Sequence, residues 1–188
     1  MGLDLMAFSN VAVLPRDHGR SEYECLETWV DAFAYKGFHR STRGLADHDV
    51  VADQWGLDLI AVRDYDITGS TTHSWRGGSY SGYGRRRAEL ARFADIPDAH
   101  SVSADAMDLW IDEHQEKPFF ELVWFADNEG AIGHEAARDL LADFVAHRDE
   151  LLAPARSGDT STWLSESWID DWIRGLTLAA NDGLVRFR

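Results

Sequence analysis

The chain of 188 residues is poor in cysteine, in basic residues and in long apolar runs. Its one cysteine, Cys25, has no second cysteine with which to form an intramolecular disulfide or a thiolate metal site. No stretch approaches the ~18 consecutive apolar residues that a membrane span needs, and the apolar part of residues 1–10 is too short and too acidic for a signal peptide. We therefore expect a disulfide-free, cytoplasmic protein that does not enter a membrane.

The shortage of basic residues also bears on partners. The 18 arginines and lysines stand against 33 aspartates and glutamates, so the formal net charge is -15. Residues 1–94 carry 11 basic and 13 acidic side chains, whereas residues 95–188 carry 7 and 20. A protein that coats nucleic acid must neutralise phosphates, and the one dense basic run is the arginine triplet at residues 85–87. The composition therefore argues against nucleic acid as a partner.

What the chain does contain is enough apolar surface for one folded unit, with 45% hydrophobic and 12% aromatic residues. Alternating apolar and polar residues predict a strand over residues 2–9, and a second strand is expected over residues 184–187 after an Asn-Asp-Gly stop. The apolar run at residues 119–126 predicts a buried central strand, and residues 57–62 are also strand-like. Residues 67–83, dense in glycine, serine and threonine, are expected to form a loop or an irregular strand.

Apolar residues at three- to four-residue spacing predict the helices. These are residues 85–93, 104–114, 135–152 and 161–180, with a shorter helix that begins near Cys25. Ser103 is a candidate cap for the second of them. We expect one α+β domain over residues 1–188, in which a small sheet packs against several helices and the C-terminal half is rich in helix.

The first candidate site is the segment of residues 77–87. Its glycines let a ligand approach the backbone, Tyr80 and Tyr83 offer stacking faces, and Arg85 and Arg87 can grip a phosphate or carboxylate. Ser79 lies among the glycines and is a further candidate for ligand binding. This mixture fits a planar, anionic ligand such as a nucleotide. The structural alternative is a glycine-rich turn whose tyrosines fill the core edge and whose arginines neutralise acidic residues of the second half.

The second candidate site is the acidic turn that precedes the long helix at residues 135–152. Asp127 and Glu129 can accept hydrogen bonds from ligand hydroxyls or amines, and free backbone N–H groups at the start of a helix can hold an anion. Asn128 lies between the two carboxylates and is included in the predicted site. The structural alternative is an Asx turn or helix cap, in which Asp127 or Asn128 satisfies the same N–H groups.

Common catalytic and metal-binding spacings are missing from the sequence. The eight histidines form no His-x-x-x-His or His-Glu-x-x-His pair. The Gly-Ser-Tyr-Ser-Gly run at residues 78–82 has tyrosine where a nucleophile elbow has serine. We predict no catalytic residue and no resident cofactor; the alternative is Mg²⁺ or Ca²⁺ on the oxygens of Asp127 and Glu129.

Four parts of the chain resemble a family of uncharacterised proteins from bacteria and their phages. They are residues 1–5, Gly-Ser-Tyr-Ser-Gly-Tyr at 78–83, the block at 118–133 and Ala-Ala-Asn-Asp-Gly at 179–183. Members typically read Gly-Ser-Tyr-Gly-Gly-Tyr-Asn-x-Trp-Arg and Phe-Ser-Asp-Cys-Glu-Gly-x-Ile-Gly-Pro. This chain has Gly84, Arg86 and His134 where the family has the asparagine, the tryptophan and the proline. The resemblance carries no established activity, but it implies that both candidate segments belong to one fold, and the phage context suggests sequestration of a host defence signal.

Three functional hypotheses follow. The preferred one is non-enzymatic binding of a small, polar, nucleotide-like ligand between the two candidate segments. The second is a Mg²⁺-dependent hydrolase of a nucleotide-like substrate, with Glu121 or His134 as base. The third is an acidic interaction protein that binds a basic host factor. A homo-oligomer is compatible with each.

Overall fold

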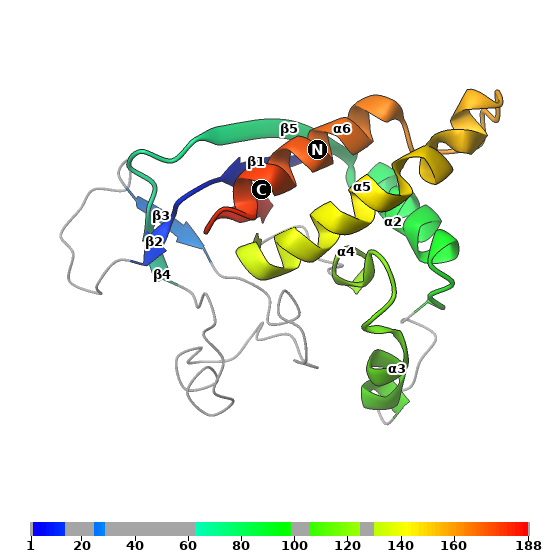
Figure 1. The fold of residues 1–188 in the computed structure, drawn as a ribbon, viewed down its shortest axis with the longest axis horizontal. Helices are drawn as coiled ribbons and strands as arrows, with labels where there is room; N and C mark the ends of the chain where they lie inside the picture. The colour runs from blue at the N-terminus through cyan, green and yellow to red at the C-terminus, as the bar shows by residue number, and fades with distance from the viewer. Residues whose placement is uncertain (1, 14–24, 29–62, 99–105, 125–129, 188) are drawn as a thin grey trace.

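The fold is described from a computed structural model and covers residues 2–13, 25–28, 63–98, 106–124 and 130–187. Its main sheet is antiparallel, with the strand order β5–β1–β7–β6 (Figure 1). The strands are β1 (Gly2–Phe8), β5 (Thr72–Ser79), β6 (Gly130–Gly133) and β7 (Leu184–Phe187). The strands predicted at the two ends of the chain are therefore confirmed, and they lie side by side in the middle of the sheet.

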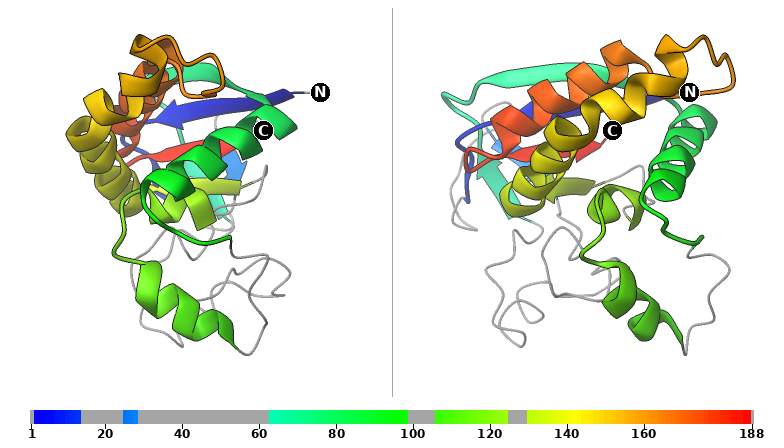
Figure 2. Two further views of the ribbon diagram at one scale, coloured as in Figure 1. Left: turned by 90° about the vertical axis from the view of Figure 1, so that its right-hand side faces the viewer. Right: turned by 45° about the vertical axis from the view of Figure 1, so that its right-hand side comes forward.

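The two faces of the sheet have different surroundings. Alternation along β1 buries Leu3, Leu5 and Ala7 on one face and leaves Asp4 and Met6 exposed on the other. The buried face is covered by two long helices, α5 (His134–Arg156) and α6 (Glu166–Ala179), which pack together as an antiparallel pair (Figure 2). The fold is therefore α+β, with helices gathered on one side of an antiparallel sheet.

The segment expected to be a loop or an irregular strand contains a strand with one irregularity. The register between β1 and β5 shifts between Leu3 and Asp4, which leaves Gly77 as an extra residue in a bulge. Helix α2 (Tyr80–Phe93) then begins at Tyr80, because the Ser79 hydroxyl caps it by accepting a hydrogen bond from the Gly82 N–H at 3.0 Å. The irregular strand predicted within residues 67–83 is therefore confirmed at Thr72–Ser79, where two glycines accommodate the bulge. The helix predicted from residue 85 begins five residues earlier, because Ser79 caps it.

The predicted central strand at residues 119–126 is also wrong. Residues Phe120–Trp124 form a short helix, α4, which follows Phe119 in a left-handed backbone conformation with φ of 63°. The Val123 N–H donates to the Phe119 carbonyl at 2.9 Å, as in a helical turn. A short apolar run has no period that separates a buried strand from a buried helix, which explains the error.

The remaining elements differ from prediction at their boundaries. Helix α3 is Met107–His114, and α6 begins at Glu166, where Ser165 caps it, rather than at residue 161. The helix expected to begin near Cys25 is wrong at Cys25–Thr28, which is strand β3, and the rest of that prediction lies outside the described residues. Strand β3 pairs with β4 (Arg63–Asp66), which also pairs with β2 (Ala12–Val13) in a second sheet. The predictions for residues 57–62 and 99–105, with Ser103, lie outside the described residues.

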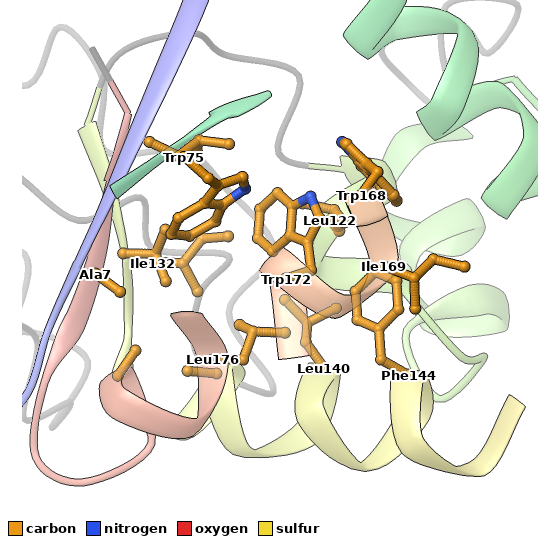
Figure 3. Close-up of a cluster of buried hydrophobic side chains, with 14 of the residues drawn as sticks. Ala7, Trp75, Leu122, Ile132, Leu140, Phe144, Trp168, Ile169, Trp172 and Leu176 are labelled. Carbon is orange, nitrogen blue, oxygen red and sulfur yellow. The ribbon is translucent and has the colours of Figure 1, made fainter. Parts of the chain in front are cut away.

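Aromatic rings fill the space between the sheet and the two long helices. Trp172 of α6 lies between Trp75 of β5 and Phe144 of α5, with ring centroids 5.4 and 6.1 Å away (Figure 3). Trp168 and Phe187 contact the same indole from other directions. The predicted apolar stripe of α6 is therefore the core of the protein. None of the helices in the described residues has the length and apolar character to cross a membrane.

Candidate ligand-binding groove

The three consecutive arginines at the middle of α2 have three different environments. Arg87 is directed inward, where its Nε donates to the Leu122 carbonyl at 3.0 Å and its Nη2 donates to the Val123 carbonyl. These two carbonyls belong to the last turn of α4. No later N–H group of that helix is present to donate to them. Burial lowers the pKa of Arg87, and the neighbouring Tyr83 and Asp98 act in the opposite direction. Arg87 therefore fastens α4 to α2.

The Arg86 side chain is partly buried. Its Nη1 donates to the Gly77 carbonyl at 2.6 Å and its Nε donates to the Trp163 carbonyl at 3.0 Å, while its guanidinium lies 5.4 Å from the Trp168 ring centroid. Arg85 lies outermost, with its guanidinium 4.4 Å from the centroid of the Trp163 ring. Successive helix positions turn by about 100°, so three adjacent arginines reach three different places.

A groove of about 590 Å³ runs along the outer side of α2. Its other wall is the C-terminal part of α5 and the connection between α5 and α6, which lies at the same end of the molecule as α2 (Figures 1 and 2). Arg85 and Arg92 line the α2 wall, and Trp163, 40% exposed, lines the other. The volume falls in the range of roughly 300–1,000 Å³ that is usual for small-molecule sites.

Both backbone polar groups of Trp163 are hydrogen-bonded to side chains of α2. Its N–H donates to Glu89 Oε1 at 2.7 Å, and its carbonyl accepts the Arg86 bond described above. Glu89 Oε2 also accepts from Thr162 Oγ1 at 2.9 Å and from the Leu164 N–H at 3.3 Å. One turn of α2 therefore holds three residues of the connection, although the Trp163 indole itself stays in contact with solvent.

The charges in the groove are largely uncompensated. Within the part of the chain that the structure describes, the guanidinium groups of Arg85 and Arg92 make no ion pair and no hydrogen bond. Glu150 and Asp159 line the opposite wall. Hydrogen bonds from the Ser161 hydroxyl and N–H lower the pKa of Asp159, so its carboxylate is ionised at neutral pH. The groove thus combines an aromatic face, two guanidinium groups and carboxylates.

The structure distributes the predicted site residues over several places. Arg85 lines the groove, whereas the Ser79 hydroxyl serves as the α2 cap. Tyr80 is 41% exposed and lines a second hollow of about 560 Å³, on the open face of the sheet beside Met6. Tyr83 is buried, and burial raises the pKa of its phenol despite the opposing charge of Arg87. The structure therefore does not bring the tyrosines to the Arg85 groove.

The acidic turn, with Asp127, Asn128 and Glu129, lies outside the described residues. Of the elements on either side of it, α4 accepts hydrogen bonds from Arg87 of α2, and β6 pairs with β7, where the Phe187 ring lies 6.1 Å from that of Tyr83. Of the two residues suggested as bases, Glu121 is 6% exposed in α4 and His134 is the first residue of α5. Among the described residues, no three or more His, Cys, Asp or Glu side chains are grouped as they would be around a metal ion.

The sequence analysis missed Trp163, Glu89 and Arg92. The helix predicted over residues 161–180 includes Trp163, yet Trp163 does not fall on the apolar stripe formed by Leu164, Trp168 and Trp172. Its position outside that stripe, next to a predicted connection, was the one sign in the sequence that the indole could face solvent. No protein-family model, curated protein or solved structure matches the chain. The resemblance to a phage family therefore stays a prediction.

Proposed function

We propose that the protein binds a small, planar, anionic ligand of the nucleotide type in the groove beside α2. The observation that carries the proposal is the solvent-exposed indole of Trp163, whose backbone is held on both sides by Glu89 and Arg86. An exposed side chain on a connection is ordinarily free to reorient, so these hydrogen bonds prepare an aromatic face before a ligand arrives. Preorganisation of this kind reduces the entropy that binding must overcome.

The chemistry of the groove supports a ligand with both a ring and an anion. Stacking of a base on an aromatic side chain contributes about 1–3 kcal/mol. Arg85 and Arg92 are the two guanidinium groups on the same wall, and a guanidinium suits phosphate oxygens because it donates two parallel hydrogen bonds. The proposal involves binding alone and no chemical step. With the phage resemblance, it extends to sequestration of a signalling nucleotide.

Isothermal titration with mononucleotides and cyclic dinucleotides tests the proposal directly. We expect at least one nucleotide to bind, and we expect Trp163→Leu and Arg85→Ala each to weaken that binding by tenfold or more, an order-of-magnitude expectation from the loss of stacking or of one charge-assisted contact. Arg174→Ala is the matched control, because Arg174 is an exposed arginine of α6 that does not line the groove. Absence of binding by every nucleotide, or equal binding by all four proteins, would contradict the proposal.

The hydrolase and the acidic interaction protein remain predictions from sequence. The hydrolase depends on Asp127 and Glu129, which lie outside the described residues. The interaction protein depends on acidic helices, and part of that acidity is engaged within the molecule: Arg148 donates to Asp170 at 2.7 Å and to Glu166 at 2.9 Å between α5 and α6. Neither hypothesis draws support from the groove.

A further inference from the structure

The two walls of the groove carry charges of opposite sign. The cationic wall is α2, with Arg85 and Arg92. The acidic wall is formed by Glu150 near the end of α5 and by Asp159 in the connection. Glu89 also lines the groove, but its carboxylate oxygens accept hydrogen bonds from residues 162–164. The two acidic groups left to face a ligand are therefore on the side opposite the arginines.

These opposite charges do not neutralise each other. No ion pair joins either arginine to Glu150 or Asp159 in the described part of the molecule, so N–O distances across the groove exceed 4.0 Å. Glu150 instead accepts from His147 at 3.3 Å on its own helix, and one Asp159 oxygen accepts from Ser161. An exposed ion pair contributes little to stability, so leaving these charges unpaired costs the folded protein little.

A ligand that fills this gap must satisfy both walls. A guanidinium donates hydrogen bonds and accepts none, and an ionised carboxylate accepts them and donates none. A purely anionic ligand such as inorganic phosphate would meet attraction at α2 and repulsion at Glu150 and Asp159. A ligand with an anion at one end and hydrogen-bond donors at the other would match both.

We propose that the ligand lies across the groove with its anionic group at Arg85 and Arg92 and with amino or hydroxyl donors at Glu150 and Asp159. This inference rests on the proposed function and narrows it to nucleotides that present donors, from an amino-bearing base, from a ribose, or from both. Uracil, which has a carbonyl where cytosine has an amino group, fits the acidic wall less well. A carboxylate also pairs well with vicinal ribose hydroxyls, as in dinucleotide-binding folds.

The experiment compares ligands that differ by one donor. AMP against purine riboside monophosphate removes the amino donor of the base, and CMP against UMP replaces that amino group with a carbonyl while adding an N3–H donor. Each ribonucleotide against its 2′-deoxy form removes one sugar donor. Inorganic pyrophosphate is the anion without donors. Affinities are measured by calorimetry for the unmodified protein, for Asp159→Asn and Glu150→Gln, and for the control Glu113→Gln, an exposed residue of α3 outside the groove.

We expect loss of one donor to weaken binding by about tenfold, since a hydrogen bond to a charged group is lost. Asp159→Asn or Glu150→Gln should reduce that preference to within about twofold and should raise the affinity for pyrophosphate, because repulsion is relieved. Glu113→Gln should behave as the unmodified protein. If nucleotides bind but every donor pair and pyrophosphate bind alike, the inference is overturned and the proposed function stands. If no nucleotide binds, the proposed function itself fails.

Discussion

Two tryptophans near each other in sequence, Trp163 and Trp172, are held in opposite ways. Trp172 is fully buried among aromatic rings, and within the described residues its indole N–H has no hydrogen-bond partner. Trp163 has both backbone groups bonded to α2 and its indole in a groove open to solvent. Packing alone positions the buried side chain, whereas hydrogen bonds to charged groups position the exposed one. The difference separates residues that stabilise the fold from residues arranged for a ligand.

The largest effect is expected in the core. Trp172→Ala removes an indole from close contact with Trp75 and Phe144 and should lower the free energy of unfolding by about 3–5 kcal/mol. Trp163→Ala should lower it by about 1 kcal/mol, mainly through loss of the contact with Arg85. Urea denaturation followed by circular dichroism measures both. Similar losses in the two variants would refute the distinction between core and groove.

Two arginines of α2 show the same contrast between a residue that stabilises the fold and a residue that faces the groove. Arg87→Ala leaves the Leu122 and Val123 carbonyls without their donor and should destabilise the protein by about 2–3 kcal/mol. Arg85→Ala should change stability by less than about 0.5 kcal/mol while it weakens nucleotide binding. Thermal unfolding with calorimetric binding of the same samples separates the two outcomes. If Arg85→Ala lowered the stability and Arg87→Ala left it unchanged, the roles assigned to the two arginines would be wrong.

A smaller effect is expected when the attachment of Trp163 is loosened. Glu89→Gln replaces a carboxylate that accepts three hydrogen bonds with a neutral amide, at a cost of about 1 kcal/mol. The Trp163 and Leu164 amides should then exchange hydrogen about fivefold faster, as that free-energy change implies for local opening. Hydrogen exchange measured residue by residue by NMR tests this, with Glu113→Gln as the control. Unchanged exchange at both amides would show that Glu89 does not hold the connection.

The smallest effect at neutral pH concerns Tyr83. Burial raises the pKa of its phenol above the ordinary value of 10.0, so the folded protein keeps the phenol protonated where the unfolded chain would lose the proton. This contribution to stability is complete below pH ~10 and decreases as the pH rises above it. Tyr83→Phe should change stability at pH 7 by less than about 1 kcal/mol and should make unfolding less sensitive to alkali.

Unfolding of the two proteins between pH 8 and 11 is the measurement. The difference in unfolding free energy between Tyr83→Phe and the unmodified protein should grow in favour of phenylalanine above pH ~10. A constant difference over this range would mean that Tyr83 titrates normally in the folded state.

The regular spacing of apolar residues predicted the strands and helices whose buried face follows that spacing. Alternation over residues 2–9 and the apolar stripes of α5 and α6 led to the correct elements, with errors at their ends. The run at residues 119–126 is apolar except for Glu121, so its period did not separate helix from strand. Its helical turn depends on Arg87, a donor 35 and 36 residues away from the carbonyls it meets.

The candidate site was harder to predict for the same reason. Composition predicted Arg85 as an anion-binding residue with Tyr80 and Tyr83 as its aromatic partners, whereas the ring beside its guanidinium belongs to Trp163. Glu89 reaches residues that are 73, 74 and 75 positions further along the chain. A contact made across such a separation exists only after the helices have packed, and no spacing rule in a single sequence expresses it.

The central position of β7 has a consequence for synthesis of the chain. β7 is the strand that joins β1 to β6, and it is formed by residues 184–187. On the ribosome, β1 and β5 emerge more than 100 residues before β7, so one edge of β1 has no partner strand until residues 184–187 have been made. The sheet therefore closes only after translation of β7, and a pairing between strands about 180 residues apart in sequence is of the kind that slows folding.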